Sequence, residues 1–403
     1  MNTNIKICFL ADRHDLFDER IYWKMAVPLK ERGFDVYYFL IGSERKKGKT
    51  KEGIFFEQLL VKQYSQNLYL NFILKRLDTT NNYKELFRLA SGIKADIYHF
   101  HDLWINLIAK KLKFLNHKPV VFYDVREPHS DDLVSFYGKN SISKRIVRIF
   151  AHYVDKWEKN CSKEYDLVIA TEENVGEKFR KILKKNKVEV LHNFTNIYNN
   201  YKNYSFSEKE YDFIYCGGIT ALRGAFQVLD AAKITVNKIP KVKILLLGKF
   251  SPSKLKNELQ EVIIANKLER NIYLYDSVSY KEVSDFYNKS KIGLITWLPV
   301  KALSIKMPIK IFEYMAFGLP IIGSNFGHIK DFIEKVNCGK VVNPEKPVDI
   351  SNAMVELLTN DKIYNLYSKN GRNATLMKFK WENEFDRLVG FYTKALDERK
   401  SIK

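Results

Sequence analysis

The stretch IKICFLADRHDLFDERIYWKMAVPLKERGFDVYYFLIG, residues 5–42, decides the fold class of this chain. Two apolar runs, residues 5–11 and 35–42, have the length of buried strands, and the segment between them has the apolar spacing of a helix. A strand, a helix and a second strand in this order are the repeating unit of a parallel sheet whose helices cover both faces. The stretch therefore predicts an α/β domain.

The same alternation continues along most of the chain and restarts once. Further strand-like runs lie at residues 95–102, 118–125 and 165–171, each followed by a helix-like segment. A second series begins with DFIYCGG at residue 212. Two series of this kind predict two doubly wound sheets.

The domain boundaries follow from the composition between the two series. Residues 194–211 are polar and rich in Asn, Ser and Tyr, which is typical of a linker. We therefore predict Rossmann-like domains over residues 1–193 and 212–378, and a terminal helix over residues 379–403. Ligands of such sheets bind beyond the carboxyl ends of the strands, so we expect the site in a cleft between the two domains.

The composition fits a folded chain of two domains. Its 403 residues suffice for two hydrophobic cores, and the 46% apolar and 14% aromatic content excludes a disordered protein. The apolar runs are shorter than the roughly 18 residues of a membrane-spanning helix, and no signal peptide is visible, so we expect a cytoplasmic protein. Four widely spaced cysteines without a CxxC pair argue against a zinc site and a disulfide framework.

The chain is strongly basic, with a formal net charge of +20 that is spread evenly over its two halves. Such a charge suits an anionic substrate, an acidic membrane surface or nonspecific contact with nucleic acid. The sequence has neither a zinc-finger spacing nor the aromatic and basic motif of an RNA-binding sheet. We therefore expect no nucleic-acid partner.

Three predicted strands of the first domain end in polar residues. The carboxyl ends of neighbouring parallel strands meet at one edge of the sheet, where α/β domains bind ligands. A structural role is the alternative for any single histidine, but three such strand ends in one domain favour a site. The candidates are Asp18, Arg20, His99, His101, Asp102, Asp124, Arg126, Glu127 and His129.

The second domain offers two candidate phosphate-binding elements. In MPIKIFEYMAFGLP, residues 307–320, Lys310 and Glu313 share one face near the N-terminus of a short apolar helix, the end that favours an anion. A solvated ion pair is the alternative. In CGGITALRG, residues 216–224, adjacent glycines let the backbone approach a phosphate beside Arg223, and a structural turn is the alternative.

Several other chemistries are disfavoured. The glycines after residue 216 lack the GxGxxG spacing, so a nicotinamide cofactor does not fit. The sequence has no GxxxxGK[ST] loop, no GxSxG elbow and no Asp-x-Asp metal motif after a strand. If a diphosphate is bound, we expect no metal, and Arg223, Lys310 and Lys249 to neutralise it.

These segments together resemble glycosyltransferase family 4, whose members have the two-domain GT-B fold, and the resemblance covers nearly the whole chain. The most specific part is MPIKIFEYMAFGLPIIGSNFGHIKDFI, residues 307–333, which is similar to the family's donor-site segment. CGGITALRG, HDLFDERIYWK and DIYHFHD are similar to other family patterns. Relatives of this kind build bacterial capsules, exopolysaccharides and O-antigens.

The resemblance implies a role for each candidate. Arg223 and Lys310 would hold the diphosphate of a UDP- or GDP-sugar, which acts as co-substrate, and Glu313 would bind the ribose of the nucleotide. No bound cofactor and no metal are implied. The implied donor-site residues are Gly217, Gly218, Arg223, Lys249, Lys310 and Glu313. The implied acceptor-side and catalytic residues are Asp18, Arg20, His101, Asp102, Arg126, Glu127 and His129.

Three positions depart from the family pattern. Ile305 stands where many members have a first glutamate, Gly218 stands where many have an arginine, and Arg126 stands where many have a histidine. These departures concern the choice of sugar more than the class of reaction.

The resemblance implies a metal-independent hexosyltransferase that acts with retention on a saccharide or polyprenyl-linked saccharide, with its last helix crossing back to the first domain. One alternative is a sugar-nucleotide epimerase on the same fold. The other is a noncatalytic protein that binds a polysaccharide or an anionic surface.

Two basic and apolar stretches raise the question of a membrane partner. The first is YLNFILKRL at residue 69. The second, SISKRIVRIFAHYVDKWEK at residue 141, has Ile142, Ile146, Ile149 and Tyr153 at helical spacing among Lys144, Arg145 and Arg148. Peripheral contact with the inner face of the cell membrane is one interpretation, and an amphipathic helix packed on its own sheet is the other.

Overall fold

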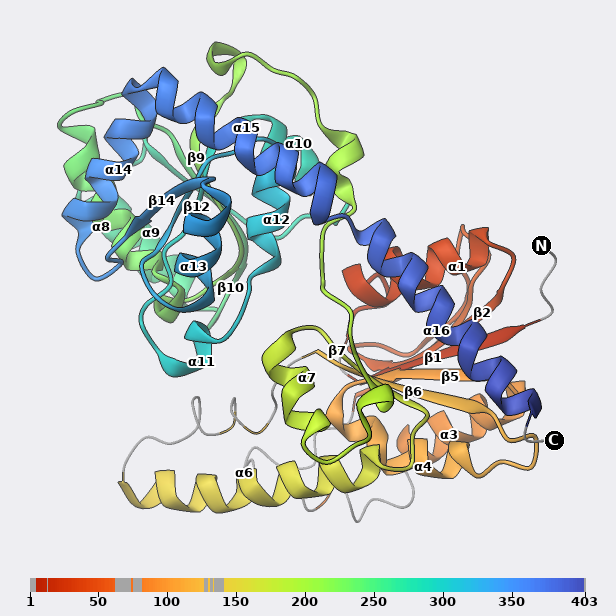
Figure 1. The fold of residues 1–403 in the computed structure, drawn as a ribbon. Helices are drawn as coiled ribbons and strands as arrows, with labels where there is room; N and C mark the ends of the chain where they lie inside the picture. The colour runs from red at the N-terminus through yellow and green to blue at the C-terminus, as the bar shows by residue number, and fades with distance from the viewer. Residues whose placement is uncertain are drawn as a thin grey trace. The chain divides into compact units, whose positions relative to one another are not determined.

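The computed structural model describes residues 5–12, 14–61, 74, 82–126, 130, 133 and 141–401. It divides into two compact units (Figure 1). The first unit comprises residues 1–193 and 381–403, and the second comprises residues 194–380, including the segment predicted as a linker. Each unit is built around a sheet of mostly parallel strands, so the predicted α/β fold with two Rossmann-like domains is confirmed.

The first unit contains an eight-stranded sheet in the order β3-β4-β2-β1-β5-β6-β7-β8, in which β3 runs antiparallel to β4. The strand order reverses at β1, because β2 and β5 lie on its two sides. Ligands of such sheets bind at the carboxyl ends of the strands around this reversal. The strands are β1 (Lys6–Asp12), β2 (Asp35–Gly42), β3 (Lys46–Lys49), β4 (Phe55–Leu60), β5 (Ile97–His101), β6 (Val120–Val125), β7 (Leu167–Ala170) and β8 (Val188–Val190).

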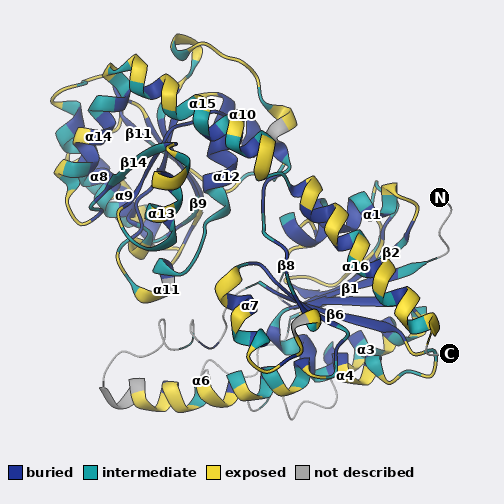
Figure 2. Cartoon of the chain, viewed as in Figure 1, coloured by how far each residue is buried: buried dark blue, intermediate teal, exposed yellow. Residues whose placement is uncertain are grey.

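Helices cover both faces of this sheet. They are η1 (Glu19–Ala26), α1 (Val27–Glu31), α3 (Asn82–Ile93), η2 (Leu103–Ile105), α4 (Asn106–Lys113), α6 (Ser141–Ser162), α7 (Glu173–Arg180), η3 (Lys185–Lys187) and α16 (Trp381–Ser401). Along β1, Ile7 and Phe9 pack into the core on one face, and Cys8 and Leu10 pack into the core on the other. Burial on both faces explains why the strands read as continuous apolar runs, and Figure 2 shows them buried.

Helix α16 returns to the first unit, as predicted. Its buried face contributes Trp381, Phe385, Leu388 and Tyr392 to the same core as Ile7 and Phe9. The Trp381 indole N–H donates a hydrogen bond of 2.6 Å to the Lys24 carbonyl oxygen. No helix in the described part of the chain is long and apolar enough to cross a membrane.

The second unit contains a six-stranded parallel sheet in the order β11-β10-β9-β12-β13-β14. The order reverses at β9, between β10 and β12. The strands are β9 (Tyr211–Ile219), β10 (Ile244–Phe250), β11 (Ile272–Tyr275), β12 (Ser290–Ile295), β13 (Ile321–Ser324) and β14 (Gly339–Val342). The helices are η4 (Ile197–Asn200), η5 (Phe206–Glu208), η6 (Ala221–Arg223), α8 (Ala225–Val236), α9 (Leu255–Ala265), α10 (Val283–Asn288), α11 (Lys301–Ser304), α12 (Ile309–Ala316), α13 (Gly327–Val336), α14 (Pro347–Thr359) and α15 (Asp361–Lys378).

Candidate functional site

Two adjacent glycines near the carboxyl end of β9 form the centre of the candidate site in the second unit. A Cβ atom added to Gly217 would lie 3.6 Å from the Lys310 Cε atom, and one added to Gly218 would lie 2.5 Å from the Arg223 Nη1 atom. Each glycine is therefore covered by one of the two predicted cations. Arg223 and Lys310, 87 positions apart in the printed sequence, thus lie beside two adjacent, half-buried glycines.

Two further glycines allow backbone segments around this site to approach one another closely. Gly248 has a φ of 151°, and a Cβ atom there would lie 1.8 Å from the Gly217 carbonyl oxygen. Gly224 has a φ of 81°, and a Cβ atom there would lie 1.9 Å from the Thr296 carbonyl oxygen. Any side chain at either position would collide with backbone. Strand β10 can therefore approach β9, and the start of α8 can approach the residue after β12, only because these residues are glycine.

Arg223 is held in place by a short turn. Thr220 caps the turn η6 by accepting a hydrogen bond of 3.1 Å from the Arg223 backbone N–H. The guanidinium donates to the Gly218 carbonyl oxygen at 3.2 Å and lies 5.2 Å from the centre of the Trp297 ring. Helix α8 begins two residues later, so a fixed positive group stands at the N-terminus of a 12-residue helix.

Lys310 and Glu313 form an ion pair on α12, with 2.6 Å between Lys310 Nζ and Glu313 Oε2. The Glu313 side chain is 0% exposed, so this is not the solvated surface pair considered as the alternative. The Tyr287 hydroxyl also donates to Glu313 Oε2, at 2.5 Å. Burial raises the pKa of Tyr287 well above its usual range, which keeps this hydroxyl a donor. Glu313 Oε1 is buried and has no hydrogen-bond partner among the described residues.

The third predicted cation, Lys249, lies on β10 directly opposite Gly218 in the strand pairing. Its side chain is exposed to solvent. The position of Lys249 is therefore compatible with an ionic contact to the same ligand.

In the first unit, a polar network joins three of the predicted residues at the carboxyl ends of β1, β5 and β6. His14 lies at its centre, with 2.9 Å between its Nε2 atom and Asp102 Oδ1 and 3.1 Å between its Nδ1 atom and Asp18 Oδ2. Arg126 donates to the same Asp18 oxygen at 3.0 Å. The sequence prediction did not single out His14, although its place two residues after the first strand was a usable signal.

The two carboxylates keep His14 charged. Burial alone would lower the pKa of His14, but the charge of Asp102 and the hydrogen bonds to Asp102 and Asp18 outweigh burial and raise this pKa to about 9. Asp102 has a φ of 74°, an uncommon value for a residue with a side chain, and also accepts a hydrogen bond from the Asp12 backbone N–H at 3.0 Å. The network is thus a fixed arrangement of alternating charges near the surface.

Replacing His14 by glutamine is expected to remove stability at acidic and neutral pH only. Because folding raises the pKa from 6.5 to about 9, the stabilisation is fully present below pH 6.5 and is lost as the pH rises through 9. We expect the wild-type chain to exceed His14→Gln by about 2 kcal/mol at pH 6 and by little at pH 10. Denaturant unfolding of both proteins at the two pH values measures this difference. The same difference at both pH values would show that His14 is not charged in the folded protein.

Two residues predicted on the acceptor side lie in the interior instead. The Arg20 guanidinium donates to Asp124 Oδ2 from Nη2 at 2.9 Å and from Nε at 3.1 Å, and both side chains are 0% exposed. His101 is also fully buried, and burial lowers its pKa well below the usual range, so its imidazole is neutral. A residue without exposed surface cannot touch an acceptor from this position. The placement of Arg20 and His101 is therefore corrected to a structural cluster behind the site.

The same cluster contains residue types that bind metals, but its charges are already balanced without a metal cation. The ligand atoms of His99, His101 and Asp124 lie within 4.8 Å of one another. The Arg20 guanidinium already neutralises Asp124, so a divalent cation would add uncompensated positive charge to a buried place. His99 Nδ1 is within 2.5 Å of the Tyr392 hydroxyl oxygen, which connects the cluster to α16.

Glu127 and His129, the other predicted acceptor-side residues, lie outside the described residues. The basic stretch at residues 69–77 does so too, apart from residue 74. Their predicted roles stay predictions.

Helix α6 has a second apolar stripe that faces away from the sheet. Val147, Ala151 and Val154 are buried against the first unit. Ile146, Ile149 and Tyr153 are 51%, 67% and 50% exposed, although they have the spacing of an apolar helix face. The interpretation as a helix packed by these residues on its own sheet is therefore wrong for this stripe. The side chains of Ile142 and Lys144 lie outside the described part.

Comparison with known proteins relates both units to glycosyltransferases. The model of glycosyl transferases group 1 matches residues 196–374, and the model of glycosyltransferase family 4 matches residues 19–198. An uncharacterized glycosyltransferase of Methanocaldococcus jannaschii is 24% identical over 344 residues, covering 83% of this chain and 88% of that protein.

Two solved structures are similar over nearly the whole chain. Sucrose-phosphate synthase from Thermosynechococcus elongatus has a TM-score of 0.71 at 13% identity, covering 98% of this chain and all of that one. The Anabaena protein HepE, crystallised with UDP, has a TM-score of 0.68 at 14% identity, covering 97% of this chain and 100% of that one. These likenesses support the two-domain arrangement of parallel sheets.

Proposed function

Because the two family models together span residues 19–374, the chain belongs to the family 4-like glycosyltransferases of the GT-B fold, and we propose that it transfers a hexose from a nucleotide diphosphate to a saccharide or lipid-linked saccharide. The observation that carries the proposal is that Lys310 lies against Gly217 and Arg223 lies against the adjacent Gly218. Two cations beside glycine backbone, one of them next to a helix N-terminus, suit a diphosphate. We further propose retention of configuration and a role in cell-surface polysaccharide synthesis, both on the resemblance to the family.

The reaction breaks the bond between the anomeric carbon and the terminal phosphate oxygen and forms a bond from that carbon to an acceptor hydroxyl oxygen. The hydroxyl proton passes to the departing phosphate. Negative charge grows on the diphosphate as the first bond breaks, so Arg223 and Lys310 act by stabilising the leaving group. In the proposed mechanism these two side chains supply the compensating positive charge without a metal ion.

Donor binding in this scheme requires a change of partner for Lys310. In the described structure Lys310 pairs with Glu313, and the free oxygen Oε1 of Glu313 is buried. A diphosphate at Gly217 attracts Lys310 away from Glu313, which uncovers the carboxylate for a ribose hydroxyl. The ion pair thus holds both residues in position until the nucleotide arrives.

A panel of nucleotides tests the proposal. We expect UDP or GDP to raise the thermal unfolding temperature, because a ligand at 100 times its Kd stabilises the folded state by about 2.7 kcal/mol. UDP is the first choice, since HepE was crystallised with it. No response to any nucleotide would favour a noncatalytic binding protein. Consumption of a UDP-sugar without an acceptor would favour an epimerase.

The acceptor side is proposed to include Asp18, Asp102 and Arg126, held by His14. These residues are 13–22% exposed, whereas the cluster behind them is fully buried. Carboxylates and a guanidinium in fixed positions suit the hydroxyl groups of a saccharide. Glu127 and His129 remain proposed members of this group.

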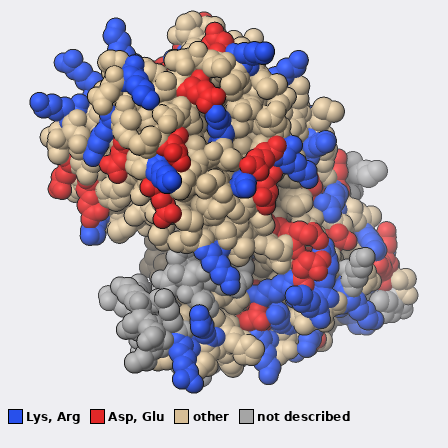
Figure 3. Space-filling view, turned by 60° about the vertical axis from the view of Figure 1, so that its left-hand side comes forward, with Lys and Arg blue, Asp and Glu red and all other residues tan. Residues whose placement is uncertain are grey.

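A membrane surface is proposed as a further partner, with the protein at the inner face of the cell membrane. The exposed stripe Ile146, Ile149 and Tyr153 runs beside exposed Arg145 and Arg148 on α6. An apolar stripe next to cations suits the boundary of an anionic bilayer. Figure 3 shows both basic and acidic side chains on the face in view.

Replacing Ile146 and Ile149 by glutamate is expected to abolish retention on phosphatidylglycerol vesicles. Burial of one isoleucine contributes about 1.5–3 kcal/mol, so each change should weaken binding by about tenfold or more. Co-sedimentation at low and high salt measures the effect. Ile264→Glu, at a 56% exposed position on α9, is the matched control and should leave binding unchanged. Equal binding by the double variant and the wild-type chain would exclude this stripe.

A further inference from the structure

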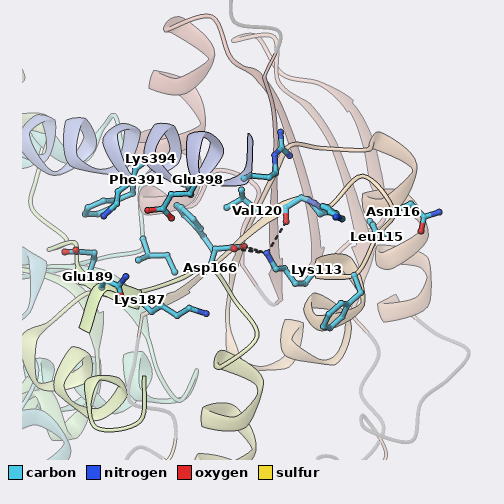
Figure 4. A pocket seen from close by; sticks show the side chains of 18 residues that line it. Lys113, Leu115, Asn116, Val120, Asp166, Lys187, Glu189, Phe391, Lys394 and Glu398 are labelled. Atoms are coloured by element: carbon cyan, nitrogen blue, oxygen red, sulfur yellow. Dashed lines mark hydrogen bonds and ion pairs between the residues drawn. The ribbon is translucent and has the colours of Figure 1, made fainter. Parts of the chain in front are cut away.

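The first unit contains a pocket at the end of its sheet opposite the candidate site. This pocket has a volume of about 760 Å³ and lies beside the amino ends of β6 and β7, against α16 (Figure 4). Such a volume is in the range of small-molecule sites. The residues at the carboxyl strand ends, His14 and Asp102 among them, do not line it. A ligand in this pocket would therefore be distinct from donor and acceptor.

The inner surface of the pocket is apolar. Val120, Phe122 and Leu167 form a buried floor. Phe391 and Ala395 form a wall from α16. Covering this surface with an apolar group would be favourable by about 25 cal/mol of free energy for each Å² removed from water.

The charges around the pocket are unevenly compensated. Lys113 pairs with Asp166 at 2.6 Å, as Figure 4 shows, and Arg399 pairs with Asp96 at 3.0 Å. Glu189 lies 3.7 Å from Arg387. The lining residues that form no ion pair with any described residue are Lys118, Lys187, Lys394 and Glu398. Three ammonium groups against one carboxylate leave an excess of positive charge at the rim.

We propose that this pocket binds an amphipathic anion, with an apolar chain against the floor and one carboxylate or phosphate head group near Lys187 and Lys394. Lys187 belongs to η3 and Lys394 to α16, and Figure 4 shows the two residues at different sides of the pocket. The chain would lie along Leu167 and Phe122, below Ala395. This proposal does not depend on the proposed transferase activity, and each can be tested without the other.

Occupation of the pocket would fasten α16 to the sheet. This helix contributes one wall, and its buried side chains belong to the core of the first unit. They are Trp381, Phe385, Leu388, Tyr392 and Leu396. A ligand that bridges Ala395 and Leu167 adds contacts present only in the folded state. Binding should therefore raise the unfolding temperature of the full chain.

The test is calorimetric titration of the full-length protein with four probes below their micelle concentrations. Decanoate and decyl phosphate are expected to bind saturably at one site, and the tighter of the two identifies the head group. Decyltrimethylammonium has the same chain with a positive head, and inorganic phosphate has no chain, so neither should bind. Equal binding of the cationic probe would overturn the proposal, and so would failure of both anionic probes.

Two variants place the site. Ala395→Trp fills the pocket and should abolish binding of the anionic probe, while Thr393→Trp, at an exposed position of the same helix outside the lining, should not. If Ala395→Trp lowers the unfolding temperature strongly, the double variant Lys187→Glu and Lys394→Glu tests the site instead. It should weaken binding by about tenfold or more. Wild-type affinity in the double variant would overturn the assigned head-group site.

Discussion

Replacing Arg223 by alanine is expected to lower the turnover number for sugar transfer by about 10²–10³-fold, the usual loss when one donor to a developing negative charge is removed. The guanidinium is fixed by the turn η6 and lies over Gly218, where the leaving diphosphate is proposed to sit. Its loss should affect the transition state more than the ground state. Turnover should therefore fall much further than the affinity for the donor, and release of nucleotide from the consumed sugar nucleotide measures both.

Two controls separate this role from a structural one. Arg223→Lys keeps a positive charge without the guanidinium fork and should retain an intermediate rate. Lys249→Ala removes an exposed cation opposite Gly218 and should lower turnover only slightly. The unfolding temperature of all three variants should stay near that of the wild-type chain. Near-normal turnover of Arg223→Ala would remove the main support for the proposed mechanism.

The placement of the residues proposed to bind the donor could be predicted from sequence because each part is local. A strand with two glycines near its end and a helix preceded by a proline each fix their own backbone, and the parallel sheet then brings their ends together. Gly217, Arg223 and Lys310 therefore lie where strand order requires. The pairing of Glu313 with Tyr287 was not predictable in this way, because it depends on how α10 packs on α12.

For the proposed acceptor side, the sequence predicted only that polar residues gather at the ends of neighbouring strands. Polar residues follow β1, β5 and β6 as expected, but the sequence does not tell which of them are covered. Arg20 is covered because its guanidinium lies 5.4 Å from the ring of Trp381, a residue of α16 that is 361 positions away. Burial of this kind is set by the last helix of the chain, whereas His14 stays partly exposed.

Helix α6 shows the same limit in a simpler form. Its sequence contains two apolar stripes of helical period, one with Val147 and Val154 and one with Ile146 and Ile149. Periodicity gives the direction of each stripe relative to the other but not which one meets the sheet. The structure buries the first and leaves the second exposed.

Replacing Glu313 by glutamine is expected to lower the affinity for UDP by about 10–100-fold, since a hydrogen bond to a charged group contributes about 1.5–3 kcal/mol. Glutamine has nearly the same shape, but it has no charge and its amide nitrogen cannot accept a hydrogen bond from a ribose hydroxyl. The Lys310 side chain also loses its ionic partner. Calorimetric titration of wild-type and variant protein with UDP measures the change.

A nucleotide without ribose hydroxyls separates these two effects. If Glu313 binds the ribose, 2′,3′-dideoxy-UDP should bind the wild-type chain much more weakly than UDP does, and Glu313→Gln should discriminate far less between the two. Tyr287→Phe removes the other hydrogen bond to Glu313 but keeps the carboxylate, so it should retain most of the discrimination. Equal discrimination by the wild-type chain and Glu313→Gln would mean that Glu313 serves only to hold Lys310. In that case the ion pair with Glu313 would serve only to position Lys310 for its contact with the diphosphate.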